Sequence, residues 1–344
     1  MAWSREAMSF VLVAVLLFTE PAISTPVPPL ITMRTNGGDQ NPPVSLAQGL
    51  RPDFYDESCP DVHGMVQTAV LEALEEDIAV AAGLLRIFFH DCFPQGCDAS
   101  ILLTGTISSE QRMPPNRGLQ PKALQLIDDI RAKVQAVCGP VVSCADITSL
   151  ATHDAVIASG GKPYYVPLGR LDSLRPAAWS YVHDLPHFTA DMSRVIDAFS
   201  SRKFFDVTDV VALSGAHSIG KAHCNTFAHR FGKEDSEFVQ RLAANCTADV
   251  HRLQDLDVNT PNMLDNMYYK NVLEGKGVLA TDQLLSSDNR TNWLVDNLAQ
   301  DEWWFWNQFG TSMSKMGRLQ GYFGNVGEVR RVSCSASNPA EYAA

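Results

Sequence analysis

The segment Arg86–Ser100, RIFFHDCFPQGCDAS, carries an unusual concentration of chemically capable side chains. It combines a permanent cation, a titratable imidazole, two carboxylates, a hydroxyl and two cysteines. Arg86 and His90 are four residues apart, so on a helix they lie on one face and reach into one space. Burying both beside Phe88 and Phe89 would be costly unless a ligand or a reaction required it. Each residue alone has an ordinary structural explanation, but the combination predicts a reactive site.

Two later segments carry polar groups that could also serve a ligand. Gly215 permits a close backbone approach just before His217, at the end of a helical pattern. The stretch 255–265 places carboxylate, hydroxyl and carbonyl oxygens at irregular spacing, which suits Ca²⁺. A core histidine and a solvated acidic loop are the ordinary alternatives, and the residues alone leave them open.

The composition excludes several functional classes. The chain has 344 residues, of which 45% are hydrophobic and 19% charged, as expected of a globular protein with one large domain or two smaller ones. A formal net charge of -12 and the lack of any basic run argue against nucleic acid or an anionic membrane as a partner.

The beginning of the chain has the features of a secretory signal. Arg5 precedes an apolar run at 10–18 that is too short to span a bilayer, and small residues at 22–24 offer a cleavage site. The sequence then divides into four expected parts: a signal peptide over 1–24, a flexible extension over 25–49, a main domain over 50–336 and a short tail over 337–344.

Eight cysteines in a secreted chain predict four disulfides. Only Cys92 and Cys97 are close enough in sequence to suggest a local bridge, and spacing leaves the other pairings open. Zinc is the alternative, but the histidines do not cluster with the cysteines and no second CxxC-type pair exists.

Apolar residues recur at intervals of three and four over much of the chain, which predicts a mainly α-helical protein with long loops and few strands. Helical spacing occurs at 66–88, 121–137, 143–158, 193–205, 210–213, 268–273 and 293–316.

Six motifs follow one another along the chain: FYDESCP at 54–60, LLRIFFHDCFPQGCDASILL at 84–103, VVSCADI at 141–147, VPLGRLDS at 166–173, VALSGAHSIGKAHC at 211–224 and DVNTPNMLDNMYY at 257–269. With them the chain resembles the secretory plant peroxidases, the class III haem peroxidases, from about Leu50 to Cys334. The resemblance implies an all-α haem peroxidase fold, with two helical subdomains enclosing haem b and minor β-hairpin content. It also implies an enzyme that reduces hydrogen peroxide to water while oxidising phenolic donors in one-electron steps.

The resemblance further implies roles for individual residues. On the peroxide (distal) side these are Arg86, Phe89 and His90, with Asn116 accepting the other imidazole proton and Glu110 holding Asn116. His90 would serve as base and then acid, and Arg86 would stabilise developing negative charge. On the opposite (proximal) side His217 would bind the iron, and Asp282 would hydrogen-bond to His217.

Two calcium ions are implied as well. The distal ligands would come from Asp91, Pro94, Gly96, Asp98 and Ser100, and the proximal ligands from Ser218, Asp257, Thr260, Met263 and Asp265. The implied disulfides are Cys59–Cys138, Cys92–Cys97, Cys144–Cys334 and Cys224–Cys246. Pro186 would lie at the haem edge where reducing aromatics dock.

Asn245-Cys-Thr and Asn289-Arg-Thr are glycosylation sequons. Asn289 is favoured, because Asn245 neighbours a cysteine expected to be bridged. We expect a secreted monomer without a membrane partner, in the apoplast rather than the vacuole.

Two other functions compete with the peroxidase. A non-catalytic secreted homologue would keep the fold without turnover, but the intact reactive residues argue against it. A hydrolase built on Asp209, Ser214 and His217 would crowd its catalytic set on one short segment, and no G-x-S-x-G elbow exists.

Overall fold

The computed structural model describes residues 45–46, 49–202, 204–320 and 326–339 of the chain. The expected signal peptide over 1–24 lies outside these residues, as do most of the extension over 25–49 and the end of the tail at 340–344. Among the described residues, none of the helices combines the length and apolarity that crossing a membrane requires.

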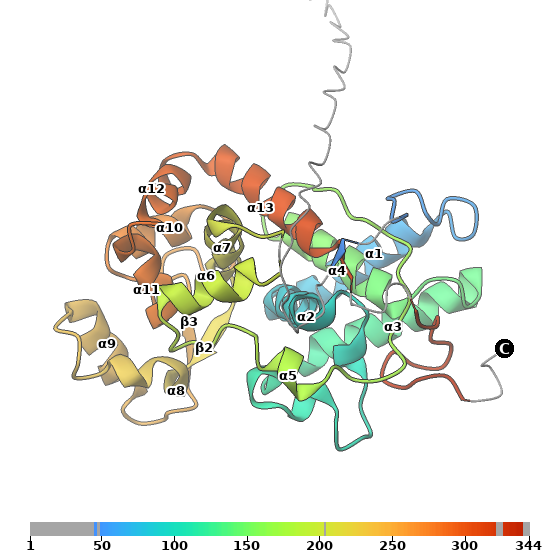
Figure 1. Cartoon of the computed structure of the whole chain (residues 1–344), viewed down its shortest axis with the longest axis horizontal. Helices are drawn as coiled ribbons and strands as arrows, with labels where there is room; N and C mark the ends of the chain where they lie inside the picture. Colours follow the sequence, from blue (N-terminus) through green and yellow to red (C-terminus); the bar gives the residue numbers. More distant parts are fainter. Residues whose placement is uncertain (1–44, 47–48, 203, 321–325, 340–344) are drawn as a thin grey trace, which may run out of the picture. The chain divides into compact units, whose positions relative to one another are not determined.

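Helices dominate the described residues, which confirms the predicted all-α class (Figure 1). The α-helices are α1 Val62–Glu76, α2 Ala79–Gln95, α3 Pro121–Cys138, α4 Cys144–Ala158, α5 Trp179–Val182, α6 Met192–Ser200, α7 Val207–Ser214, α8 Cys224–Phe227, α9 Glu237–Cys246, α10 Met267–Leu273, α11 Ala280–Ser287, α12 Asn292–Gln300 and α13 Glu302–Met316. The 3₁₀ helices are η1 Ser100–Leu102, η2 Glu110–Arg112, η3 Pro114–Asn116, η4 Gly215–Ser218 and η5 Ala228–Arg230.

The helices of the unit Pro42–Ala344 pack in two groups. In the first group α1, α2, α3 and α4 contact one another, and in the second α10, α11 and α12 do so, with α6 and α13 packed on α7. Helix α13 contacts both α7 and α2, so it joins the groups (Figure 1). This arrangement agrees with the expected two helical subdomains.

Strands are short and few among the described residues. β1 Ser45–Leu46 pairs with β4 Leu319–Gln320, and β2 Lys221–His223 pairs with β3 Leu253–Asp255, both antiparallel. The expected β-hairpin is corrected in one respect. β2 and β3 are separated in the chain by α8, η5 and α9, so they are not joined by a turn.

Three of the expected helical segments differ from the structure. The stretch 66–88 belongs to two helices, because Asp77 leaves the helical conformation and its side chain accepts the N–H of Ala79 (3.1 Å). The stretch 293–316 is also two helices: Asp301 is extended and caps α13 by accepting the N–H of Trp304 (2.9 Å). The stretch 193–205 is helical only to Ser200, and Asp206 then starts a new helix with a capping box.

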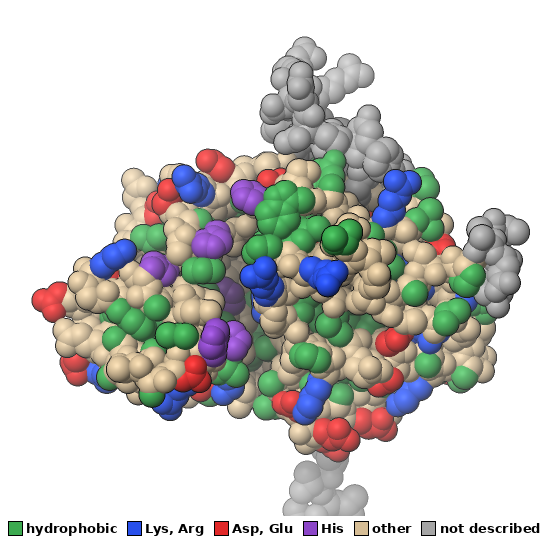
Figure 2. All heavy atoms as spheres, turned by 90° about the horizontal axis from the view of Figure 1, so that it is seen from below, with side chains coloured by type: hydrophobic (Ala, Val, Ile, Leu, Met, Phe, Trp, Pro, Cys, Tyr) green, Lys and Arg blue, Asp and Glu red, His purple; other side chains and the backbone are tan. Residues whose placement is uncertain are grey.

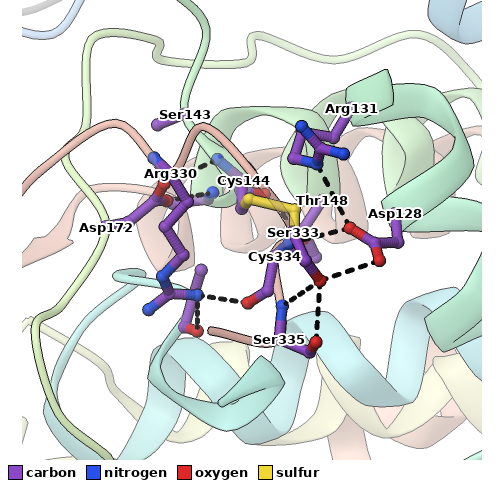
Figure 3. Close-up of a disulfide and its surroundings, with 12 residues drawn as sticks. Asp128, Arg131, Ser143, Cys144, Thr148, Asp172, Arg330, Ser333, Cys334 and Ser335 are labelled. Atoms are coloured by element: carbon purple, nitrogen blue, oxygen red, sulfur yellow. Dashed lines mark hydrogen bonds and ion pairs between the residues drawn. A yellow bond between two sulfur atoms is a disulfide. The ribbon is translucent and has the colours of Figure 1, made fainter. Parts of the chain in front are cut away.

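Four disulfides connect the described residues: Cys59–Cys138, Cys92–Cys97, Cys144–Cys334 and Cys224–Cys246. These are the pairings that the resemblance implies. Cys144–Cys334 attaches the C-terminal segment 326–339 to α4 (Figure 3). Asp128 accepts the N–H of Cys334 (2.7 Å) and the hydroxyl of Ser333 (2.9 Å), which fixes the segment against α3 as well.

The buried Arg330 connects this segment to the loop that follows α2. Its guanidinium donates to the carbonyl oxygens of Ala99 (2.8 Å) and Ser173 (2.7 Å), and its backbone N–H donates to Asp172 (3.1 Å; Figure 3). The N–H of Thr104 in turn donates to the carbonyl of Ser335 (2.9 Å). The chain's last described segment therefore supports the loop beside the candidate site.

Candidate functional site

Helix α2 and the turn that ends at Asn116 position the imidazole of His90. His90 Nδ1 lies 2.7 Å from Asn116 Oδ1, and Asn116 Nδ2 donates to the carbonyl of Glu110 (3.0 Å). Because the amide nitrogen of Asn116 is already a donor, its oxygen faces His90 and the proton of the imidazole lies on Nδ1. The Nε2 lone pair of His90 is then available as a base.

Glu110 holds Asn116 through its backbone rather than its side chain. Its carboxylate oxygen Oε1 instead accepts the N–H of Ala177 (2.7 Å). Burial raises the pKa of Glu110 to about 7, although this hydrogen bond opposes the shift. Glu110 is therefore a partner of Asn116, as predicted, but the contact is made by the backbone carbonyl oxygen of Glu110.

Arg86 lies one turn before His90 and is anchored to the same turn. Its guanidinium donates to the carbonyl oxygens of Pro115 (3.2 Å), Arg117 (3.1 Å) and Gly118 (3.0 Å). Burial, and next the charge of Arg86, lower the pKa of His90 to about 3, while the hydrogen bond to Asn116 opposes them. His90 is therefore neutral at ordinary pH.

The second candidate histidine, His217, lies in η4 and has a carboxylate behind it. His217 Nδ1 is 2.9 Å from Asp282 Oδ1, and the hydroxyl of Tyr268 donates to the same oxygen (2.9 Å). Asp282 is buried in the first turn of α11, where the helix N-terminus favours negative charge. Burial alone would lower the pKa of His217, but the charge and hydrogen bond of Asp282 raise it above its ordinary value.

The two histidines belong to segments that approach each other closely. A Cβ placed on Gly220, three residues after His217, would lie 2.8 Å from the Cβ of Ala82 on α2. The positive charge of Arg86 acts to lower the pKa of both histidines, which agrees with both lying near Arg86. The side chain of His217 is 40% exposed although Asp282 behind it is 4% exposed. Figure 2 shows a hollow on one face with His, Lys and Arg side chains gathered around it.

The end of α2 and the loop after it carry several buried oxygen atoms. The carboxylate of Asp91 accepts the N–H of Ala99 (3.0 Å), and Asp98 Oδ1 accepts the N–H of Ser100 (3.0 Å). Burial raises the pKa of Asp91 well above its usual range, with the charge of Asp98 adding to the effect. Ser100 Oγ and Glu110 Oε2 are buried without a hydrogen-bond partner in the described part of the chain.

The residues of this loop fit a hard cation. Two carboxylates that repel one another, an unpartnered hydroxyl and an unpartnered carboxylate oxygen are what Ca²⁺ would satisfy. Pro94 lies in the last turn of α2, and Gly96, with φ 109°, ends the helix, so both lie on the backbone between Asp91 and Asp98. Within the described residues no three His, Cys, Asp or Glu side chains gather so that they alone could hold a metal, so backbone and hydroxyl oxygens are needed here.

The loop 257–265, on the side of His217, also carries buried oxygen atoms. Asp257 is fully buried. Its Oδ1 accepts hydrogen bonds from the backbone N–H groups of Asn259 and Thr260 and from the side-chain amide of Asn271. Its Oδ2 lacks a hydrogen-bond partner in the described part of the chain. Burial raises the pKa of Asp257. This orphaned oxygen fits a cation.

Other members of the proximal set lie around Asp257. Thr260 Oγ1 donates to Asp265 (3.1 Å), and the carbonyl of Met263 accepts the N–H of Asp265 (3.0 Å). Ser218, directly after His217, is buried, and the neighbouring bridge between Ile219 and Asn262 joins its segment to the loop.

The remaining predicted residues lie at the margins of the site or outside it. Phe89 stacks on Phe93 and meets the ring of His90 edge-on, with ring centroids 5.9 Å apart. Pro186 is half-buried and precedes the exposed His187. Asn245 and Asn289 are both exposed.

The alternative hydrolase set does not assemble. The hydroxyl of Ser214 donates to the carbonyl of Val210 (2.8 Å) within α7, and Asp209 pairs with Lys315 (2.5 Å). His217 is held by Asp282 instead.

Sequence reasoning missed two residues that the structure places beside the site, Tyr268 and Arg330. Tyr268 donates to Asp282, and Arg330 supports the loop after α2. Tyr268 lies within the motif at 257–269, whereas Arg330 lies outside the six motifs, and no spacing rule connects residue 268 with 282 or residue 330 with 99.

Comparison with known proteins agrees with this geometry. Residues 66–301 match the family model described as Peroxidase. The chain is 44% identical to Cationic peroxidase SPC4 of Sorghum bicolor over 315 residues, which cover 89% of this chain and 86% of that protein. It is 36% identical to Peroxidase 12 of Arabidopsis thaliana over 99% of this chain and 95% of the relative. It is 41% identical to Peroxidase 22.3 of Oryza sativa subsp. japonica over 86% and 93%, respectively. This chain therefore belongs to the peroxidase family and is related to the class III peroxidases of plants.

Proposed function

We propose that this protein is a secreted haem peroxidase that reduces hydrogen peroxide to water and oxidises small phenolic donors one electron at a time. One observation supports this most strongly. His90 and His217 belong to segments that are in contact at Ala82 and Gly220, and each has Nδ1 in contact with a side-chain oxygen. Among the described residues neither Nε2 has a hydrogen-bond partner. The imidazole of His90 is neutral, which suits a base, and that of His217 is paired with the buried carboxylate of Asp282, which suits an iron ligand.

The proximal residues fit a haem. Nε2 of His217 would bind the iron, while Asp282 orients the ring and increases its electron donation. When bound, haem supplies the redox chemistry, because it accepts oxidising equivalents from peroxide and passes them to donors singly.

The distal residues move the protons. His90 Nε2 takes a proton from one oxygen of the peroxide and returns it to the other, which leaves as water. Asn116 keeps the imidazole in the tautomer that this transfer requires. The guanidinium of Arg86, fixed by three carbonyl groups, stabilises negative charge on the departing oxygen.

Phenolic donors would dock at the edge formed by Pro186 and the aromatic residues that follow it. The rings of His187 and Phe188 have centroids 4.0 Å apart, and Phe188 lies 6.1 Å from His229. A planar ring could stack on this surface. Each donor leaves as a radical after giving up one electron and one proton.

The two oxygen-rich loops would each hold one Ca²⁺, which the orphaned oxygens of Ser100, Glu110 and Asp257 support. Chelation should loosen the loop after α2, displace Asn116 through Glu110 and slow the reaction with peroxide before the fold is lost. Metal analysis, thermal unfolding and stopped-flow kinetics on one chelated sample would check this. Unchanged rate and stability after verified calcium removal would refute the calcium assignment.

Secretion to the apoplast, a monomeric state and a glycan on Asn289 complete the proposal. The four disulfides support an oxidising compartment, and the exposure of Asn289 is compatible with modification.

An absorption spectrum of the secreted protein, before and after one equivalent of hydrogen peroxide, tests the function. We expect a Soret band that shifts with peroxide and returns when a phenol is added. A folded protein without haem, or haem that ignores peroxide, would instead support the non-catalytic homologue.

A matched pair of variants separates the role of His90 from a general effect of losing a histidine. His90→Leu should retain the Soret band but slow the reaction with peroxide by about 10²–10⁴-fold. His223→Leu removes an exposed histidine of β2 and should react at the wild-type rate.

A further inference from the structure

The carboxylate behind His217 is shared between two donors. Asp282 Oδ1 accepts from His217 Nδ1 and from the hydroxyl of Tyr268, each at 2.9 Å. The rings of His217 and Tyr268 are nearly perpendicular, with centroids 6.4 Å apart. Asp282 and Tyr268 are 3% and 2% exposed, so water does not replace either hydrogen bond.

We propose that Tyr268 is a positioning residue that limits how much negative charge Asp282 transfers to His217, and thereby sets the reduction potential of the bound haem. This inference rests on the proposed function, since it requires that His217 binds the iron. Nothing in the chemistry of the His217–Asp282 pair by itself requires the third residue.

His217 and Tyr268 compete for one oxygen of Asp282. A hydroxyl that donates to a carboxylate disperses its charge and weakens its attraction for the imidazole proton. Without Tyr268 the buried carboxylate would draw the Nδ1 proton of His217 more strongly, and the ring would gain imidazolate character. A more anionic axial ligand stabilises ferric over ferrous iron.

Tyr268 also connects this pair to the proximal oxygen-rich loop. It is the second residue of α10, and the N–H of the first, Met267, donates to Asp265 (2.9 Å). The conformation of the loop 257–265 is therefore linked to the position of the Tyr268 hydroxyl.

The adjacent tyrosine provides an internal control. Tyr269 is equally buried, but one residue further along the helix it points elsewhere, and its hydroxyl donates to the carbonyl groups of Val211 (2.9 Å) and Ala212 (3.2 Å) on α7. Tyr269→Phe removes a buried hydroxyl of the same kind without changing the hydrogen bonds of Asp282.

The test is the ferric–ferrous midpoint potential of the holoenzyme, measured by spectroelectrochemistry for wild type, Tyr268→Phe and Tyr269→Phe. We expect a more negative potential and a higher iron–histidine stretching frequency in Tyr268→Phe alone. An unchanged or more positive potential in Tyr268→Phe would overturn the inference, and so would an equal shift in Tyr269→Phe.

If Tyr268→Phe fails to fold, 3-fluorotyrosine incorporated at position 268 keeps the shape and makes the hydroxyl a stronger donor. The potential should then shift in the positive direction, and an unchanged or more negative potential would overturn the inference. Wild-type protein that binds no haem or ignores peroxide refutes the proposed function. Wild-type protein that reacts, with variants that do not differ from it, refutes only the role of Tyr268.

Discussion

Asn116 determines which nitrogen of His90 is free to act as a base. Asn116→Val removes the oxygen that accepts from Nδ1, so the imidazole loses both its orientation and its fixed tautomer. We expect the rate constant for reaction with peroxide to fall by about 10–100-fold. Stopped-flow absorption would measure it, and the retained Soret band would show that haem is still bound. A wild-type rate in this variant would contradict the role of Asn116.

The pKa of His90, lowered to about 3, makes a prediction about pH. A histidine with a lowered pKa stays neutral, and so remains a base, at every pH above that value. The rate constant for reaction with peroxide should therefore be level from about pH 8 to pH 5 and decline only in stronger acid. An inflection near the ordinary histidine pKa of about 6.5 would show that the pKa of His90 is not lowered and that its imidazole is protonated in mild acid.

At this scale, sequence reasoning identifies Arg86 and His90 because helical periodicity places residues four apart on one face. It does not identify the partnership of His217 and Asp282, which are 65 residues apart and meet only through the packing of η4 and α11. The resemblance to a family supplied that pair. Tyr268 was missed by both routes, because its contact with Asp282 depends on the direction in which α10 leaves the loop.

The approach of η4 to α2 depends on a glycine. Gly220 has φ 96° and no room for a side chain against Ala82, whereas Gly232 has φ 69° and open space around it. Gly220→Ala should lower the free energy of unfolding by about 1–3 kcal/mol more than Gly232→Ala, and should also weaken haem binding. Urea denaturation and haem titration of the two variants would check this. Equal losses would show that backbone strain alone, and not the contact with α2, matters at Gly220.

Helix content is predicted well from apolar periodicity, and helix ends are predicted less well. The bounds 121–137 and 143–158 nearly match α3 and α4, because apolar residues recur along the buried face of each helix. Polar residues such as Arg131 and Asp146 are buried among them without disturbing the pattern. Asp77 and Asp301 break other runs because their carboxylates accept backbone N–H groups at a new helix start. Such polar breaks do not interrupt an apolar pattern, so the pattern does not reveal them.

Across the whole molecule, Cys144–Cys334 closes the longest loop of the four disulfides, with a sequence separation of 190, whereas Cys92–Cys97 spans 5. In the chain-entropy view the longer bridge stabilises the fold by about 5 kcal/mol and the shorter by about 2 kcal/mol. The double variant Cys144→Ala/Cys334→Ala should therefore lose more stability in urea than Cys92→Ala/Cys97→Ala. The reverse order would indicate that Cys92–Cys97 contributes more to the free energy of unfolding, because it holds the loop after α2 in place.

The attachment of the C-terminal segment to the loop after α2 has a consequence for biosynthesis. Arg330 and Ala99 are 231 residues apart, and a ribosome adding about 5–20 residues per second needs roughly 10–50 seconds to cover that distance. Throughout that interval the loop after α2 lacks the hydrogen bond that Arg330 donates to Ala99. The candidate site beside α2 is therefore synthesised early and completed late. We expect premature chain termination near the C-terminus to impair this site, although it lies more than two hundred residues upstream.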